Sequence, residues 1–206
     1  VEFIEWSAFY GCSSLSELTF SAENIDGVSD STFEGTPFKT NSLKQGVFYF
    51  YDKILGFDAD KLEANLVIPE GITGKESVSF SGQTVLETVV FPESFAHIAD
   101  NMFYNCGLTS VSLPSKLESI GAKSFYGSAF TELAFPNSLT TIGANAFEKC
   151  TSLTKVDFNE GLARIGDNAF LSCSGLTSVI LPESLESIGD YAFKSCGALA
   201  TFEMKN

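Results

Sequence analysis

The chain has 206 residues and a formal net charge of −14, from 26 acidic and 12 basic residues, and 44% of its residues are hydrophobic. This composition is too apolar and too weakly charged for a disordered chain. No apolar run approaches the ~20 residues of a membrane helix, so we expect no membrane insertion. Because the acidic excess repels phosphate backbones, we expect no nucleic-acid binding either.

The first residues of the chain belong to partial copies of a repeat that becomes regular later on. The frame of this repeat is L-x-x-V-x-L-P-x-x-L-x-x-I-G-x-x-A-F-x-x-C. Ile4, Phe9 and Cys12 match the end of one copy, and residues 15–33 match a second copy with one extra residue near Asn24. Because a unit this short cannot bury its own apolar side, the copies must stack on one another.

Residues 38–62 form an irregular unit that departs from the frame. Val47–Tyr51 and Ile54–Phe57 flank Asp52-Lys53, which predicts a β-hairpin insertion. Both faces of the first strand are apolar, so we expect one face to pack on the core, while the other is a candidate surface. Its four aromatic residues are either a partner-binding cluster or core packing: Phe48, Tyr49, Phe50 and Tyr51.

One further partial copy spans residues 66–80, and five regular copies span residues 86–198. The V-x-L segment has the period of a strand with one buried face, and it should pair in parallel with its neighbours. The following Pro ends the strand, and the Ile-Gly step turns the chain. Asp100, Asp167 and Asp190 then resemble N-caps of a short helical turn. The alternative for these carboxylates is a row of calcium ligands.

Stacking turns each position of the frame into a row of like residues. Phe103, Phe125, Phe147, Phe170 and Phe193 form a phenylalanine row, with Phe80, Phe33 and Phe9 at its earlier end. The five cysteines form a second row, which is either an inward thiol ladder, the source of a disulfide between neighbouring copies, or a metal site: Cys12, Cys106, Cys150, Cys173 and Cys196.

The sequence contains no recognisable set of catalytic residues. We therefore expect that the protein is not an enzyme and that it binds no cofactor and no metal. His97 is the only histidine, and it occupies a solvent-facing position of the frame, which leaves no partner for a nucleophilic cysteine. Carboxylate pairs exist, but none lies in a recognisable cleft of the kind that glycosidases use. The glycines mark the turns of the repeat, and they form no phosphate-binding loop.

The segment I-G-x-x-A-F-x-x-C within this frame resembles the BspA-like class of leucine-rich repeats over nearly the whole chain. The resemblance implies a leucine-rich-repeat solenoid of the α/β repeat class. It would be curved and right-handed, mostly parallel β with short helical turns, and built of about eight or nine units in one domain over 1–206. The family is found mainly in secreted or surface-anchored proteins of host-associated bacteria, so the resemblance implies an extracellular or cell-surface location. Some members are adhesins.

The outward positions of the strands vary, whereas the inward rows are fixed. This variation fits either a recognition surface or any solvated face, and the concave side of a solenoid is the usual binding surface. We therefore expect a monomeric, non-catalytic module that binds a host or bacterial surface protein, or a glycan. The alternative is a structural spacer that presents other domains. The candidate binding residues on the sheet are Glu132, Lys155, Asp157, Ser178 and Ile180.

Overall fold

The computed structural model describes residues 3–19, 27–73 and 78–205. The chain divides into two compact units, Val1–Glu63 and Ala64–Asn206. Phe20 and Asn24, which the frame of the second partial copy includes, lie outside the described residues. None of the helices in the described part of the chain is long and apolar enough to cross a membrane.

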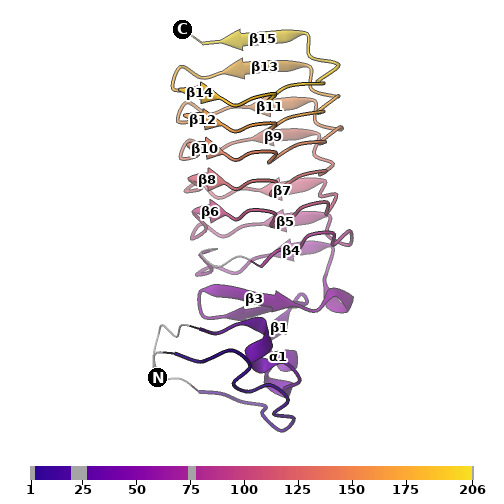
Figure 1. The fold of residues 1–206 in the computed structure, drawn as a ribbon, viewed down its shortest axis with the longest axis vertical. Helices are drawn as coiled ribbons and strands as arrows, with labels where there is room; N and C mark the ends of the chain where they lie inside the picture. The colour runs from indigo at the N-terminus through magenta and orange to yellow at the C-terminus, as the bar shows by residue number, and fades with distance from the viewer. Residues whose placement is uncertain (1–2, 20–26, 74–77, 206) are drawn as a thin grey trace. The chain divides into compact units, whose positions relative to one another are not determined.

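The first unit combines short helical segments with a three-stranded antiparallel sheet in the order β1-β2-β3 (Figure 1). Strands β2 and β3 form a hairpin at the position where the sequence predicts one, with Tyr51 and Asp52 in its turn. Strand β1 pairs with β2 and was not expected from the sequence. The elements of this unit are η1 (Asp30–Phe33), α1 (Pro37–Asn41), β1 (Leu43–Lys44), β2 (Val47–Phe50), β3 (Lys53–Phe57) and η2 (Ala59–Lys61).

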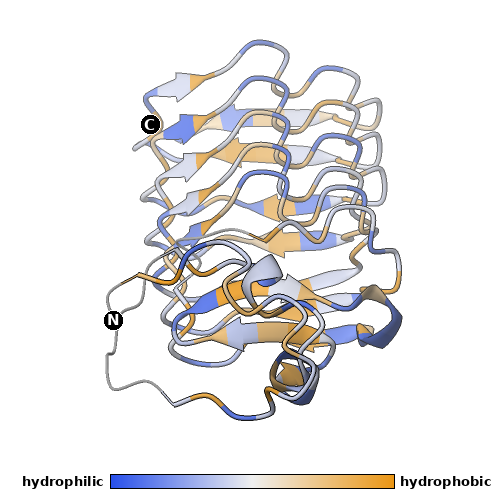
Figure 2. Ribbon diagram, turned by 60° about the horizontal axis from the view of Figure 1, so that its bottom comes forward, coloured by the Kyte–Doolittle hydropathy of each residue, from blue (hydrophilic) through white to orange (hydrophobic). Residues whose placement is uncertain are grey.

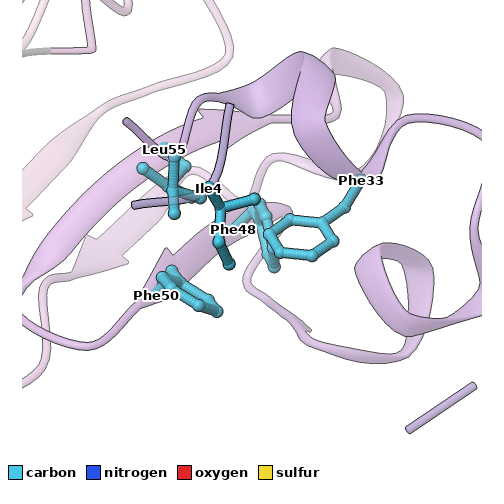
Figure 3. Packing of buried hydrophobic residues seen from close by; sticks show 6 residues of the cluster. Ile4, Phe33, Phe48, Phe50 and Leu55 are labelled. Atoms are coloured by element: carbon cyan, nitrogen blue, oxygen red, sulfur yellow. The ribbon is translucent and has the colours of Figure 1, made fainter. Parts of the chain in front are cut away.

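The core of the first unit joins the partial repeats to the hairpin. Phe33 lies at its centre, against Phe48 and Phe50 from β2 (Figure 3). The rings of Phe9 and Phe33 stack with their centroids 5.6 Å apart and their planes 3° apart. The two partial copies of the first unit therefore stack as the frame predicts.

The second unit is a β-solenoid in which the V-x-L segments form one column of parallel strands (Figure 1). Neighbouring strands pair residue for residue, so that Lys155 lies between Glu132 and Ser178. The column consists of two sheets, β4-β5-β7 and β9-β11-β13-β15. Its strands are β4 (Asn65–Val67), β5 (Thr88–Val90), β7 (Ser110–Ser112), β9 (Glu132–Ala134), β11 (Lys155–Asp157), β13 (Ser178–Leu181) and β15 (Thr201–Met204).

A second column of parallel strands, in the order β14-β12-β10-β8-β6, lies across the core from the first (Figure 1). Each strand has two residues and ends at the isoleucine of the Ile-Gly or Ile-Ala step. The sequence predicts only a turn here, at the Ile-Gly step. The strands are β6 (His97–Ile98), β8 (Ser119–Ile120), β10 (Thr141–Ile142), β12 (Arg164–Ile165) and β14 (Ser187–Ile188).

The predicted phenylalanine row of the second unit is confirmed as a continuous stack. Its rings follow one another with centroids 5.3–5.9 Å apart and planes within 13° of parallel. The middle rings are fully buried. In Figure 2 the apolar segments alternate with polar ones along the strands, as a half-buried strand requires. The row consists of Phe80, Phe103, Phe125, Phe147, Phe170 and Phe193.

The cysteine row is an inward ladder of free thiols in the second unit. Each buried thiol donates a hydrogen bond to the carbonyl of a phenylalanine one turn earlier, as Cys173 does to Phe147 over 3.1 Å. Burial raises the pKa of the Cys106 thiol to about 11, so this sulfur stays protonated at neutral pH. The prediction is wrong for Cys12, which is exposed. The buried members are Cys106, Cys150, Cys173 and Cys196.

The expected helical turn before each phenylalanine is absent from the described part of the second unit, which contains no helix. Asp100 is followed by Asn101, with φ of 56°, and Asp167 is followed by Asn168, with φ of 57°. This left-handed backbone conformation is incompatible with a right-handed helix at these positions. The aspartates instead cap the next turn of the solenoid. For example, the Asp100 carboxylate accepts a hydrogen bond from the backbone N–H of Ala122 over 2.6 Å.

A polar ladder joins the turns that follow the first column. Ser138 and Ser184 donate their hydroxyl hydrogens to the carbonyl of a leucine one turn earlier. One copy has Gly161 at the serine position and Asn159 in place of the usual proline. The Asn159 amide donates to the Leu139 carbonyl over 2.9 Å and supplies the missing bond. The departure from the frame at residue 159 therefore compensates for the departure at residue 161.

Candidate binding surface

The first column of the second unit presents two rows of outward side chains, which we call the outer face. Strand alternation places them opposite the buried rows. All five candidate residues predicted on the sheet belong to it; Ser178 is half-buried and the other four are exposed. The first row is Asn65, Thr88, Ser110, Glu132, Lys155, Ser178 and Thr201, and the second is Val67, Val90, Ser112, Ala134, Asp157, Ile180 and Glu203.

A hollow of about 170 Å³ lies on this face over strands β11 and β13. Four of the five predicted residues line it, and Glu132 lies on the neighbouring strand, directly beside Lys155. Lys205, which follows β15, also lines the hollow and was not predicted as a site residue from the sequence. The hollow is lined by Lys155, Val156, Asp157, Phe158, Ser178, Ile180 and Lys205.

Two ion pairs border the hollow. The Lys155 ammonium lies 2.9 Å from the Asp157 carboxylate, and Lys205 pairs with Glu160. The hydrogen bond from Lys155 to Asp157 raises the pKa of this ammonium, which is therefore charged at neutral pH. Ile180 contributes an apolar surface that is 44% exposed. The hollow thus brings charged side chains of both signs and an apolar surface together.

The four aromatic residues predicted on the hairpin differ in how far they are buried. Phe48 and Phe50 are 0% and 7% exposed, so most of both rings belongs to the core of the first unit. Tyr51 is 44% exposed and lines a groove of about 330 Å³ together with Tyr49. Burial raises the pKa of the Tyr49 hydroxyl. The groove is lined by Leu18, Thr19, Phe38, Tyr49, Phe50 and Tyr51.

A second cavity of the first unit, of about 480 Å³, was not predicted from the sequence. Its lining includes Lys39, whose ammonium lies 2.6 Å from both Asp30 and Glu34. Burial lowers the pKa of Lys39, but the two hydrogen bonds outweigh burial and the pKa is raised. Within the described ranges, no group of three or more His, Cys, Asp or Glu residues could hold a metal ion.

His97 lies on the exposed side of β6, as predicted, away from every thiol of the buried ladder. Its Nδ1 atom is 2.9 Å from the Ser119 hydroxyl, and its Nε2 atom is 3.9 Å from the Glu118 carboxylate. All three residues lie on or next to the second column, which lies across the core from the first column (Figure 1).

Comparison with protein families gives a match to the BspA type leucine rich repeat region, in six copies over residues 1–108 and 96–206. No curated protein matches the chain.

Three solved structures share the fold. A leucine-rich repeat protein from Bacteroides ovatus is 28% identical with a TM-score of 0.64, over 79% of this chain and 45% of that one. A leucine rich repeat protein from T. pallidum is 27% identical with a TM-score of 0.64, over 74% and 78%. The pneumococcal vaccine antigen PcpA, at 23% identity and a TM-score of 0.58 over 78% and 46%, shows the fold alone. The chain thus spans less than half of the Bacteroides ovatus protein.

Proposed function

The chain belongs to the BspA-type leucine-rich repeat family, and we propose that it is a non-catalytic module that binds a surface protein or a glycan through its outer face. Family membership supports a place on the surface of a bacterium or outside it. We further propose that the module is monomeric and is a right-handed array of eight or nine turns in one domain, with the outer face on its concave side.

The observation that carries the proposal is the hollow on the outer face. Elsewhere along the strands, the outer face presents mainly short side chains such as Ser110, Ser112 and Ala134. At β11 and β13 it presents opposite charges around an exposed Ile180. Interfaces draw their affinity from a few such places, while the surrounding residues exclude water.

The experiment uses the full chain on arrays of matrix proteins, bacterial surface proteins and glycans. We expect at least one retained partner, and we expect its affinity to fall at least tenfold in the variant Lys155→Glu/Asp157→Lys. Both side chains are exposed and their pair contributes little to stability, so the fold is retained. The matched control is Arg164→Glu on β12, which is exposed on the second column and should bind as the unchanged chain does.

If the Lys155→Glu/Asp157→Lys variant bound the partner as tightly as the unchanged chain does, the outer face would not be the binding surface. The groove at Tyr49 and Tyr51 is the second candidate surface, because one exposed and one half-buried tyrosine line the same open groove. A loss of binding in Tyr51→Ala alone would then favour the hairpin. No retained partner on any array, with function kept after deletion of whole repeats, would favour a spacer.

A further inference from the structure

The outer face carries more negative than positive charge. Its two outward rows contain three carboxylates, on Glu132, Asp157 and Glu203, and a single ammonium, on Lys155. Lys155 pairs with Asp157, and the second ion pair that borders the hollow adds no net charge. We propose that the sheet β9-β11-β13-β15 of this face binds a cationic segment of a protein partner, in which an apolar residue lies between two basic ones. The inference rests on the proposed function and names the chemistry of its ligand.

Two carboxylates of this sheet are left for a partner. Among the residues that the structure describes, neither Glu132 nor Glu203 belongs to an ion pair, and both side chains are exposed. Lys155 attracts Glu132 as well as Asp157, but one ammonium balances only one of these two negative charges. A basic group of a partner therefore gains attraction at β9 and at β15 without first breaking an existing pair.

An exposed apolar side chain lies directly beside one of these carboxylates. Ile180 is 44% exposed, and it pairs in register with Glu203 on the neighbouring strand. Neighbouring strands lie about 4.8 Å apart, so a residue that packs on Ile180 brings the next basic side chain within reach of Glu203. Lysine and arginine also have apolar stems that can cover Ile180 themselves, and arginine binds a carboxylate through two parallel hydrogen bonds.

The spacing of the two carboxylates sets the spacing of the basic residues. Glu132 lies on β9 and Glu203 on β15, at the two edges of the sheet β9-β11-β13-β15. Strand steps of about 4.8 Å add up to about 14 Å across this sheet. An extended segment rises about 3.4 Å per residue, so basic residues four positions apart span about the same distance. Exposed ion pairs contribute at most about 1 kcal/mol each, so both are needed, and the net charge of −14 adds long-range attraction of a cation.

The remainder of the outer face is uncharged and favours a protein over a glycan. The outward residues of β4, β5 and β7 include no charged side chain, so the cationic segment is directed to one end of the face. Val67 on β4 and Val90 on β5 are 51% and 40% exposed, and an interface core needs such apolar contacts. No aromatic ring for a sugar to stack on occurs in the two outward rows. The rest of the protein partner would therefore lie along β4, β5 and β7.

The test is an NMR titration of the full ¹⁵N-labelled chain at low ionic strength with the peptide acetyl-Arg-Ser-Val-Ser-Arg-amide. Saturable shifts of the Ile180 and Glu203 amides are expected, with a dissociation constant at least fivefold lower than for acetyl-Gln-Ser-Val-Ser-Gln-amide. The difference between the two peptides should shrink at an ionic strength of about 1 M, where the screening length is about 3 Å. The variant Glu132→Gln/Glu203→Gln should bind the Arg peptide at least fivefold more weakly.

The matched control is Glu118→Gln/Glu186→Gln, which changes the net charge by the same amount at two exposed glutamates beside the second column. It should bind the Arg peptide within twofold of the unchanged chain. Three results would overturn the inference. The Gln peptide could bind as tightly as the Arg peptide, the Glu132→Gln/Glu203→Gln variant could bind unchanged, or the control could lose as much affinity, which would assign the binding to overall charge.

The proposed function is tested separately, with the partner retained on the arrays. If that partner depends on Lys155 and Asp157 but binds the Glu132→Gln/Glu203→Gln variant unchanged, the proposed function stands and this inference fails. If no array partner depends on Lys155 and Asp157, the proposed function fails.

Discussion

Replacing Phe147 by alanine is expected to lower the free energy of unfolding by about 3–5 kcal/mol, the range for a buried phenylalanine. The ring is 0% exposed and lies between Phe125 and Phe170, with centroid distances of 5.5 and 5.3 Å, and Phe135 packs against it at 5.6 Å. Truncation would leave a cavity in the middle of the stack, and both neighbouring rings would lose a partner face.

The measurement is urea unfolding followed by circular dichroism, on the full chain and two matched variants. Phe147→Leu keeps most of the buried volume and should lose about 1 kcal/mol. Phe202→Ala removes a ring that is 48% exposed and touches only one neighbour of the stack, Phe193, so its loss should also be small. If Phe147→Ala were as stable as Phe202→Ala, the stack would not be the main source of stability.

Adding one methyl group at Gly143 is expected to destabilise the chain by about 3 kcal/mol or more, at the upper end of overpacking effects. A Cβ atom there would lie 2.7 Å from the backbone nitrogen of Ala122 and 2.7 Å from the carbonyl carbon of Gly121. Both atoms belong to the backbone of the preceding turn. The clash therefore cannot be relieved by rotating a side chain, and the backbone itself would have to shift. The glycine is needed because two turns approach each other, and not for its own φ angle.

The matched control is Gly197→Ala, because a Cβ atom at Gly197 meets no atom within 4 Å. Thermal unfolding of the two variants should therefore separate them clearly, with Gly143→Ala melting well below Gly197→Ala. Equal melting temperatures would contradict the close approach of neighbouring turns at the Ile-Gly step.

The rows of the core were predictable because each one repeats a residue type at a fixed spacing. The phenylalanine stack and the four buried thiols followed directly from the frame, as did the outward position of Lys155 and Asp157. Cys12 has the same frame position, but it belongs to a partial copy in the first unit, where it is exposed. Other frame positions of the partial copies, such as those of Ile4 and Phe33, are buried as the frame predicts.

The strands of the second column, the left-handed turns and the position of Lys205 were not predicted from the repeat frame. The two-residue strands of the second column are too short to show an alternating pattern. The signal against a helical turn was present in Asn101 and Asn168, since asparagine accepts a left-handed backbone more easily than most residues. Lys205 reaches the hollow through its pairing with Glu160, 45 positions earlier, and only the stacked structure shows this.

The most direct test of the outer face as a binding surface is lysine acetylation footprinting by mass spectrometry. The full chain is labelled alone and in complex with a partner retained on the arrays. We predict that the partner protects Lys155 and Lys205 at least fivefold, while Lys116 and Lys149, which lie outside the hollow, react at the same rate in both samples. Equal labelling of Lys155 and Lys205 with and without the partner would contradict the assignment of the outer face.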